Sequence, residues 1–269
     1  MNQQTPEELP WPENPRDAMA RLVDEQGGLL YSLGMRFCGD SGEAEDLVQE
    51  TFIQAFRSWD SFEHRSKVST WLYSIAARVC QRMHRKRAGE PDSIGSLQEL
   101  LPFGEPQIAQ VASDLDEAVV AQIRKESIEE MESSIAELPM EFRMPLVLKD
   151  IIGLTVPEIS EATGIQEGTV KSRVHRARLK LRMLIDGKLP RTEESPPPAA
   201  YPIQVCLDLL DAKQSSLDRE TEFRSEVICQ RCQSVFASLD LTQDVCGELA
   251  SGKIPEGLRG RLEDAIDEL

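Results

Sequence analysis

Aromatic residues are scarce in this sequence, since phenylalanine, tryptophan and tyrosine make up only 5% of its 269 residues. The strands of β-sandwiches favour aromatic and β-branched side chains, whereas this chain has long runs rich in Ala, Leu, Glu, Arg and Lys, which favour helices. Long apolar runs are also missing: no stretch approaches the roughly 18 apolar residues of a membrane span, and the N-terminus lacks a secretion signal. We therefore expect an all-α protein that stays in the cytoplasm.

Cysteine and histidine are sparse as well. The six cysteines are too few and too unevenly placed for a secreted disulfide scaffold. Cys38 and Cys80 fall in helical patterns and are expected to be buried as small apolar side chains. The three histidines form no convincing nucleophile, acid–base or complete metal arrangement, and no glycine-rich phosphate loop occurs. We therefore expect no enzymatic activity.

Basic residues are outnumbered, with 30 Lys and Arg against 47 Asp and Glu, giving a formal net charge of -17. Such a balance normally argues against nucleic-acid binding, because affinity for phosphates comes from Lys and Arg. Two stretches depart from the average: Arg78–Arg87 and Lys171–Arg182 are rich in basic residues and contain no acid. These local basic segments are candidates for DNA binding.

Clusters of proline and glycine divide the chain into helical modules. The divisions are a flexible N-terminus (1–15), a first module (16–88), an acidic linker (89–125), a second module (126–187), a proline-rich spacer (188–202) and a third module (203–269). Apolar residues at helical spacing predict helices over Met19–Cys38, Gly42–Ser58 and about Ser69–Arg87 in the first module.

The second module contains the pattern of a helix-turn-helix between Leu154 and Arg178. Thr155 and Glu158 form a capping box at the start of the first helix. Gly164 supplies the positive φ angle that the turn requires, and a second helix begins near Gln166. The pattern predicts a DNA-binding unit whose second helix enters the major groove.

Polar and basic residues occupy the tip and outer faces of this second helix, while Val170 and Val174 are expected to pack inward. Those expected to contact DNA are Thr169, Lys171, Ser172, Arg173, His175 and Arg176. A basic helix face is often merely solvated, and the capped first helix with its glycine turn argues against that interpretation here. A helix-turn-helix alone still fits many families of regulator.

Longer motifs are more specific. Leu138–Asp150, followed by Gly168–Arg173, resembles the promoter -35 module of extracytoplasmic-function (ECF) sigma factors of bacterial RNA polymerase. Glu45–Phe56 resembles the helix of these sigma factors that binds core polymerase, and Ser69–Ala76 resembles their -10 recognition and promoter-melting region. The resemblance implies a sigma factor that binds core RNA polymerase, recognises -35 and -10 elements of promoter DNA and initiates transcription.

Three residues are expected to form the polymerase-binding face. Asp46, Gln49 and Glu50 lie at positions i, i+3 and i+4, so they share one face of a helix whose opposite face is apolar. A solvated helix face would look the same. The resemblance identifies the partner of this face as a coiled coil of the largest polymerase subunit.

The -10 region is expected to combine an aromatic residue with a basic helix end. Unpaired bases stack on aromatic rings while phosphates follow basic charges, although Trp71 could equally be a core anchor. The expected residues are Trp71, Arg78, Arg82, Arg85, Lys86 and Arg87. Arg78 stands where relatives usually have Asn, so we do not expect the family's -10 sequence preference to transfer unchanged.

The third module resembles the small zinc-binding helical domain of anti-sigma factors. Cys206, Cys229 and Cys232 match three of its four ligands, but Ser225 stands where the family has His. Three thiolates are one ligand short of a closed tetrahedral zinc site. Bound zinc, a redox pair and a plain apolar core are therefore all compatible with these cysteines.

The third module carries more acidic than basic residues, so it could cover the basic DNA-binding surfaces. We expect residues from about Tyr201 onward to fold back and restrain the two DNA-binding modules, the competing interpretation being an activating tail. The expected partners are core RNA polymerase, promoter DNA and an anti-sigma factor or other regulatory protein. Two rival functions are an ordinary helix-turn-helix regulator and an anti-sigma-like adaptor.

Overall fold

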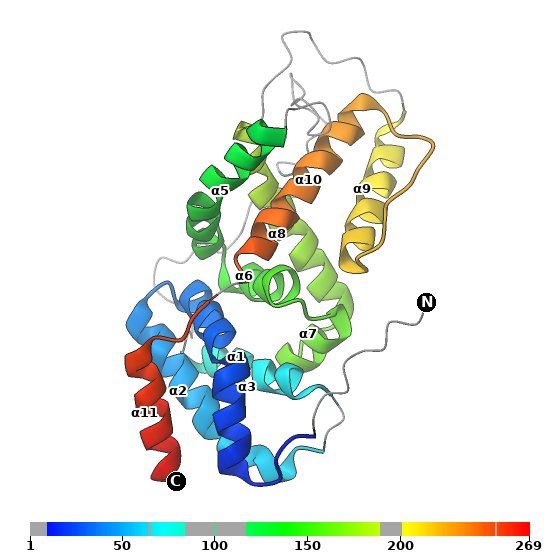
Figure 1. The fold of residues 1–269 in the computed structure, drawn as a ribbon. Helices are drawn as coiled ribbons and strands as arrows, with labels where there is room; N and C mark the ends of the chain where they lie inside the picture. Colours follow the sequence, from blue (N-terminus) through cyan, green and yellow to red (C-terminus); the bar gives the residue numbers. More distant parts are fainter. Residues whose placement is uncertain (1–9, 64–65, 84–99, 101–116, 189–200, 251) are drawn as a thin grey trace, which may run out of the picture.

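The computed structural model describes residues 10–63, 66–83, 100, 117–188, 201–250 and 252–269. Within these ranges the regular structure consists of helices, and no strand is present (Figure 1). None of these helices combines the length and the apolar character needed to cross a membrane. The expected all-α fold is confirmed.

The first module is a bundle of three helices. Its elements are α1 (Pro15–Cys38), α2 (Ser41–Ser58), the short 3-10 helix η1 (Trp59–Ser61) and α3 (Val68–Met83). Asn14 caps α1, because its side chain accepts a hydrogen bond from the Arg16 N–H at 2.9 Å, and Gly39 ends the helix with φ 71°. Cys38 and Cys80 are buried in this module, as expected.

The second module contains the helix-turn-helix. Its elements are α5 (Glu117–Glu137), α6 (Met140–Leu146), the π-helical turn η4 (Val147–Ile151), α7 (Val156–Thr163) and α8 (Glu167–Lys188). Helix α5 begins at Glu117, so the linker expected over 89–125 ends earlier than we expected. The charged residues at this end of α5 masked its helical pattern, but Ile123, Met131 and Ile135 form a buried stripe along it.

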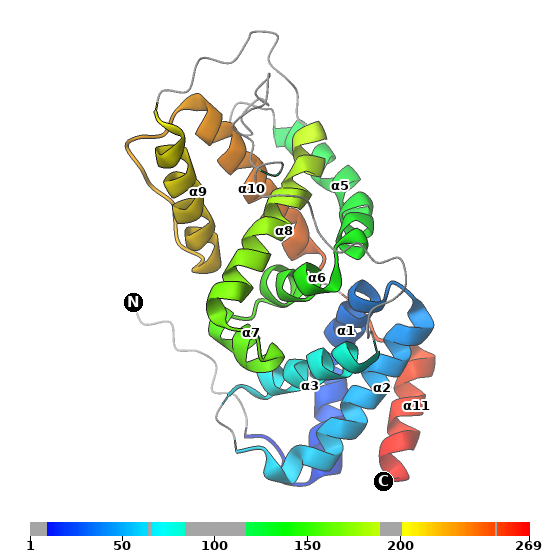
Figure 2. The same ribbon diagram turned by 180° about the vertical axis from the view of Figure 1, so that it is seen from behind.

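The third module does not stand apart as a separate lobe. Its helices are α9 (Ile203–Asp218), α10 (Gln230–Glu248) and α11 (Glu256–Asp267). Helix α10 packs on α5, α8 and η4 of the second module, whereas α11 packs on α1 and α2 of the first (Figures 1 and 2). Leu258, Leu262 and Ile266 recur every four residues and are buried, which gives α11 the apolar face for this packing.

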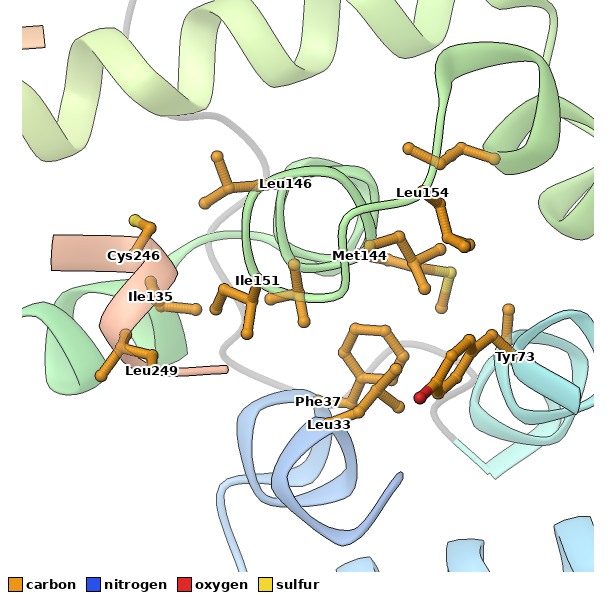
Figure 3. Close-up of a cluster of buried hydrophobic side chains, with 14 of the residues drawn as sticks. Leu33, Phe37, Tyr73, Ile135, Met144, Leu146, Ile151, Leu154, Cys246 and Leu249 are labelled. Atoms are coloured by element: carbon orange, nitrogen blue, oxygen red, sulfur yellow. The ribbon is translucent and has the colours of Figure 1, made fainter. Parts of the chain in front are cut away.

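The first and second modules also touch each other directly. Helix α3 lies against α7, and the Thr70 hydroxyl donates a hydrogen bond to Glu158 Oε1 at 2.9 Å (Figure 2). Figure 3 shows a buried apolar cluster in which Phe37 of the first module, Met144 of the second and Leu249 after α10 converge. The core therefore continues across all three modules.

Candidate promoter and polymerase interfaces

The helix-turn-helix has the geometry that the sequence predicted. The Thr155 N–H donates to Glu158 Oε2 at 2.8 Å, and the Glu158 N–H points back to the Thr155 hydroxyl, forming the capping box. Burial raises the pKa of Glu158, but hydrogen bonds from Thr155 and Thr70 and the charge of Lys67 outweigh burial and lower it. Gly164 ends α7 with φ 72°, so the turn is formed by a residue without a Cβ, as expected.

The tip of α8 is open to solvent. Thr169, Lys171 and Ser172 are exposed in its first turns, whereas Val170 and Val174 are fully buried beneath them. Short polar side chains at the N-terminal end of a recognition helix can reach base edges in the major groove. The tip therefore has the exposure that DNA reading requires.

The other predicted DNA-binding residues of α8 already have partners. Arg173 forms an ion pair with Glu141 at 2.7 Å, and the Arg176 guanidinium lies over the Phe142 ring, 5.0 Å from its centroid. His175 Nε2 lies 2.9 Å from a carboxylate oxygen of Asp218, at the end of α9. These three side chains are half-buried, so DNA would have to compete for them.

The predicted polymerase-binding residues share one face of α2. Asp46 is exposed, and Gln49 and Glu50 are half-buried. Glu50 accepts a hydrogen bond from Gln54 at 2.5 Å and lies 3.8 Å from Arg82 of α3. The acidic face of α2 therefore adjoins the basic end of α3, and Asp46 is the most accessible of the three predicted residues.

Trp71 belongs to an aromatic cluster at one end of the first module. Its ring is stacked on Phe62 at 4.7 Å between centroids and meets Trp59 edge to face at 5.7 Å. Trp11, which precedes α1, packs on Trp59 in turn. Trp71 is half-buried, so it is anchored in the cluster and still partly accessible.

The remaining predicted -10 residues follow along α3. Arg78 and Arg82 are exposed, and Arg78 donates a hydrogen bond to the Ser74 hydroxyl at 3.2 Å. Arg85, Lys86 and Arg87 lie outside the described residues. Where it is described, the basic face of α3 thus points to solvent.

Comparisons with known proteins match both modules. Residues 22–90 match the family profile of Sigma-70 region 2, and residues 128–181 match that of Sigma-70, region 4. The ECF RNA polymerase sigma factor SigW of Bacillus subtilis is 37% identical over 170 residues, which cover 62% of this chain and 88% of SigW. This chain belongs to the ECF sigma factors. As the resemblance implied, its function is to initiate transcription with RNA polymerase.

Two further relatives show how far the similarity extends. The ECF sigma factor SigE of Mycolicibacterium smegmatis is 32% identical over 60% of this chain and 59% of SigE. The solved sigma factor RpoE of Bartonella quintana, in complex with the anti-sigma factor NepR, is 26% identical. The match covers 63% of this chain and 97% of the RpoE chain, with a TM-score of 0.45. The matched family profiles end at residue 181, before the third module, so the likeness of that module to an anti-sigma domain stays a prediction.

A buried arginine links this third module to region 4 of the sigma factor. Arg178 is 1% exposed and donates to both carboxylate oxygens of Asp150 at 2.8 and 2.6 Å and to Asp218 at 2.8 Å. Burial lowers the pKa of Arg178, but the two carboxylates raise it more. Asp218 in turn keeps its pKa below the usual range: burial raises it, but His175 and Arg178 outweigh burial. Sequence reasoning missed Asp218, because an acid at a helix end has no local signal for such a distant partner.

Two of the three predicted zinc ligands, Cys229 and Cys232, are in contact. Cys229 Sγ is 3.9 Å from Cys232 Sγ. Burial raises the pKa of Cys232, and the neighbouring Cys229 and Cys206 raise it further, to about 12. Among the described residues, no three His, Cys, Asp or Glu side chains gather so that they could hold a metal ion. The zinc prediction therefore gains no support.

Proposed function

We propose that this sigma factor binds core polymerase through the α2 face of Asp46, Gln49 and Glu50, the -10 element through α3, and the -35 element through the tip of α8. The polymerase supplies the catalysis, so this chain is not itself an enzyme and works in the cytoplasm with its partner. We further propose that the present structure is a closed, inactive form, and that the third module, here called the tail (residues 203–269), holds it closed.

The direct contact between α3 and α7 carries this proposal. The names of the two promoter elements place them about 25 base pairs apart, which is roughly 85 Å of B-DNA at ~3.4 Å per base pair. Here the two helices touch through Thr70 and Glu158, and Arg143 of α6 donates to the Phe37 carbonyl oxygen of α1 at 2.9 Å. Regions 2 and 4 must therefore separate before both can engage one promoter.

The tail bridges the two regions. Helix α10 covers region 4, and residues 252–255, here called the strap, lead from it to α11 on region 2 (Figures 1 and 2). Arg16 pairs with Asp267 at 2.7 Å, and Arg261 pairs with Glu45, next to the polymerase-binding face. Exposed ion pairs of this kind contribute about 0–1 kcal/mol each.

The apolar face of α11 is the stronger attachment to region 2. Leu258, Leu262 and Ile266 are almost fully buried, and complete burial of such a side chain contributes about 1.5–3 kcal/mol. The entropy cost of ordering the tail opposes these contributions. A partner that binds the open form more tightly can therefore release the tail. Core polymerase is one such partner, and we propose that an anti-sigma factor or another regulatory protein acts on the same equilibrium.

Run-off transcription with purified core polymerase over a promoter library tests the proposal. The full chain and a chain truncated after Leu189 are compared at equal concentration, with circular dichroism to confirm that the truncated chain is folded. We expect higher promoter-dependent transcription from the truncated chain, because regions 2 and 4 no longer have to break the tail contacts. Loss of activity in a folded truncated chain would instead show that the tail activates.

A further inference from the structure

A cleft of about 570 Å³ lies between the helix-turn-helix and the end of α9. We call it the seam cleft, because one wall belongs to region 4 and the other to the tail. The charged and capping residues that line the first wall are Lys149, Lys171, Glu167 and Thr155 at the start of α7, and those that line the second are Asp218, Glu220 and Arg219. Each wall is of mixed charge: two lysines outnumber one acid on the region 4 wall, and two carboxylates outnumber one arginine on the tail wall.

Lys149 is the unusual residue of the region 4 wall. It is only 5% exposed, on the π-helical turn η4, and within the described part of the chain its ammonium group has no hydrogen bond or ion pair. Burying a charge is unfavourable unless an opposite charge accompanies it. The N-terminus of α7 lies nearby, but the Glu158 carboxylate already caps it. Lys149 and Lys171 are thus the groups of this wall that can hold an anion.

The tail wall of the seam cleft carries the carboxylate of Asp218, which faces the region 4 wall. Asp218 lies 2.9 Å from His175 Nε2 and 2.8 Å from Arg178 Nη1, so its carboxylate contacts an imidazole and a guanidinium group of the recognition helix. Asp211, two turns earlier in α9, lies 3.9 Å from His175 Nδ1. The end of α9 therefore presents acids along the flank of α8 beside the exposed tip.

We propose that the region 4 wall of the seam cleft binds a phosphate group of the DNA backbone, and that Asp218 is a built-in competitor for that DNA. The inference rests on the proposed function of region 4, which it extends by naming Lys149 as a DNA contact and Asp218 as the regulatory group. Duplex DNA lying on the tip of α8 brings phosphates to the flanks of the helix. The end of α9 occupies one of these flanks, so DNA and the closed tail exclude each other there.

Binding of a labelled mixed-sequence duplex by the full chain tests the proposal, measured by fluorescence anisotropy across a range of salt concentrations. Phosphate contacts carry no sequence information, so neither the promoter sequence nor polymerase is needed. We expect D218N to bind the duplex several-fold more tightly than the wild type. The matched control is D208N, which removes the same charge from α9 at an exposed residue paired with Gln204 of its own helix.

A second pair of variants tests Lys149 itself. In the D218N background, K149Q should reduce the slope of log affinity against log salt by about 0.9, as expected for one lost phosphate contact. K125Q, at an exposed lysine of α5, should leave the slope unchanged. Inorganic phosphate at matched ionic strength should not displace the duplex, whereas displacement that K149Q abolishes would assign the site to free phosphate and overturn the DNA assignment.

D218N binding no more tightly than D208N would reject Asp218 as a competitor, and K149Q leaving the salt slope unchanged would reject Lys149 as a phosphate contact. D218E retains the charge and should bind DNA like the wild type, which separates a lost charge from a damaged fold. These measurements contain no polymerase, so D218N can bind DNA more tightly even if truncation of the tail does not change run-off transcription. Equally, truncation can raise transcription even if D218N does not change DNA binding.

Discussion

At the scale of single residues, the contacts show which predicted side chains are free to act. Arg173 and Arg176 lie against α6 in ion-pair and cation–π contacts, whereas Lys171 is exposed at the tip of α8. Of the three proposed polymerase-binding residues, Asp46 is the most exposed, and Glu50 contacts Gln54 and Arg82. The residues that a partner meets first are therefore Lys171 on region 4 and Asp46 on region 2.

Charge reversal on α2 provides a prediction at this scale. We expect the double variant D46K/E50K to weaken binding to core polymerase by about 1–2 kcal/mol, or roughly 5- to 30-fold in Kd, because partly exposed ion pairs are individually modest. The measurement is surface plasmon resonance on immobilised core polymerase. D208K/E263K reverses two exposed acids of the tail and serves as the control for net charge. Equal Kd values for the two double variants would remove the α2 assignment.

At the scale of elements, the helix-turn-helix is specified by local chemistry. The capping box starts α7, and Gly164 ends it at φ 72° with nothing within 4 Å of the place where a Cβ would stand. The cost of any other residue there is therefore conformational and not steric, since L-residues rarely adopt this backbone region.

Substitution of Gly164 tests this element. We expect G164A to lower the free energy of unfolding by about 1–2 kcal/mol, measured by urea denaturation followed at 222 nm. The control is G260A, in the middle of α11, where a Cβ also meets nothing and the backbone is helical. Alanine should stabilise that helix by about 0.5–1 kcal/mol. A stabilising effect of G164A would show that the turn does not require the left-handed conformation.

At the scale of the whole molecule, the strap passes over α1 where two glycines meet. A Cβ built on Gly252 would lie 2.6 Å from the Gly28 carbonyl oxygen and 2.8 Å from Ser32 Cβ. Such distances do not occur for real side chains, so the backbones approach this closely only because both residues lack a Cβ. The crossing connects α10 on region 4 to α11 on region 2, so it is part of the closed arrangement.

Even one methyl group at this crossing should therefore shift the molecule toward the open form. We expect G252A to raise run-off transcription with core polymerase toward the level of the chain truncated after Leu189. G247A, near the end of α10, adds the same methyl group where nothing lies within 4 Å, and should behave like the wild type. If both variants transcribe equally, the strap crossing does not restrain the sigma factor.

Much of the fold and of the candidate site followed from local sequence features. Apolar spacing predicted α1 and α2 to within a few residues, because a buried helix face repeats along the chain itself. The capping box at Thr155 and the turn at Gly164 were predicted for the same reason, since each depends on residues at most a few positions apart. The order of two specific motifs then identified the family, independently of how the modules are arranged.

What the sequence alone determined was thus the helices, the helix-turn-helix and membership of the ECF sigma factors. Only the tertiary structure decided that α3 lies on α7, that Asp218 reaches Arg178 and His175, and that Gly252 crosses Gly28. The physical reason is that these contacts join residues far apart in the chain, so no local period or cap records them. A compact arrangement selects them by burying apolar faces and pairing the charges beside them, and that selection depends on the whole molecule.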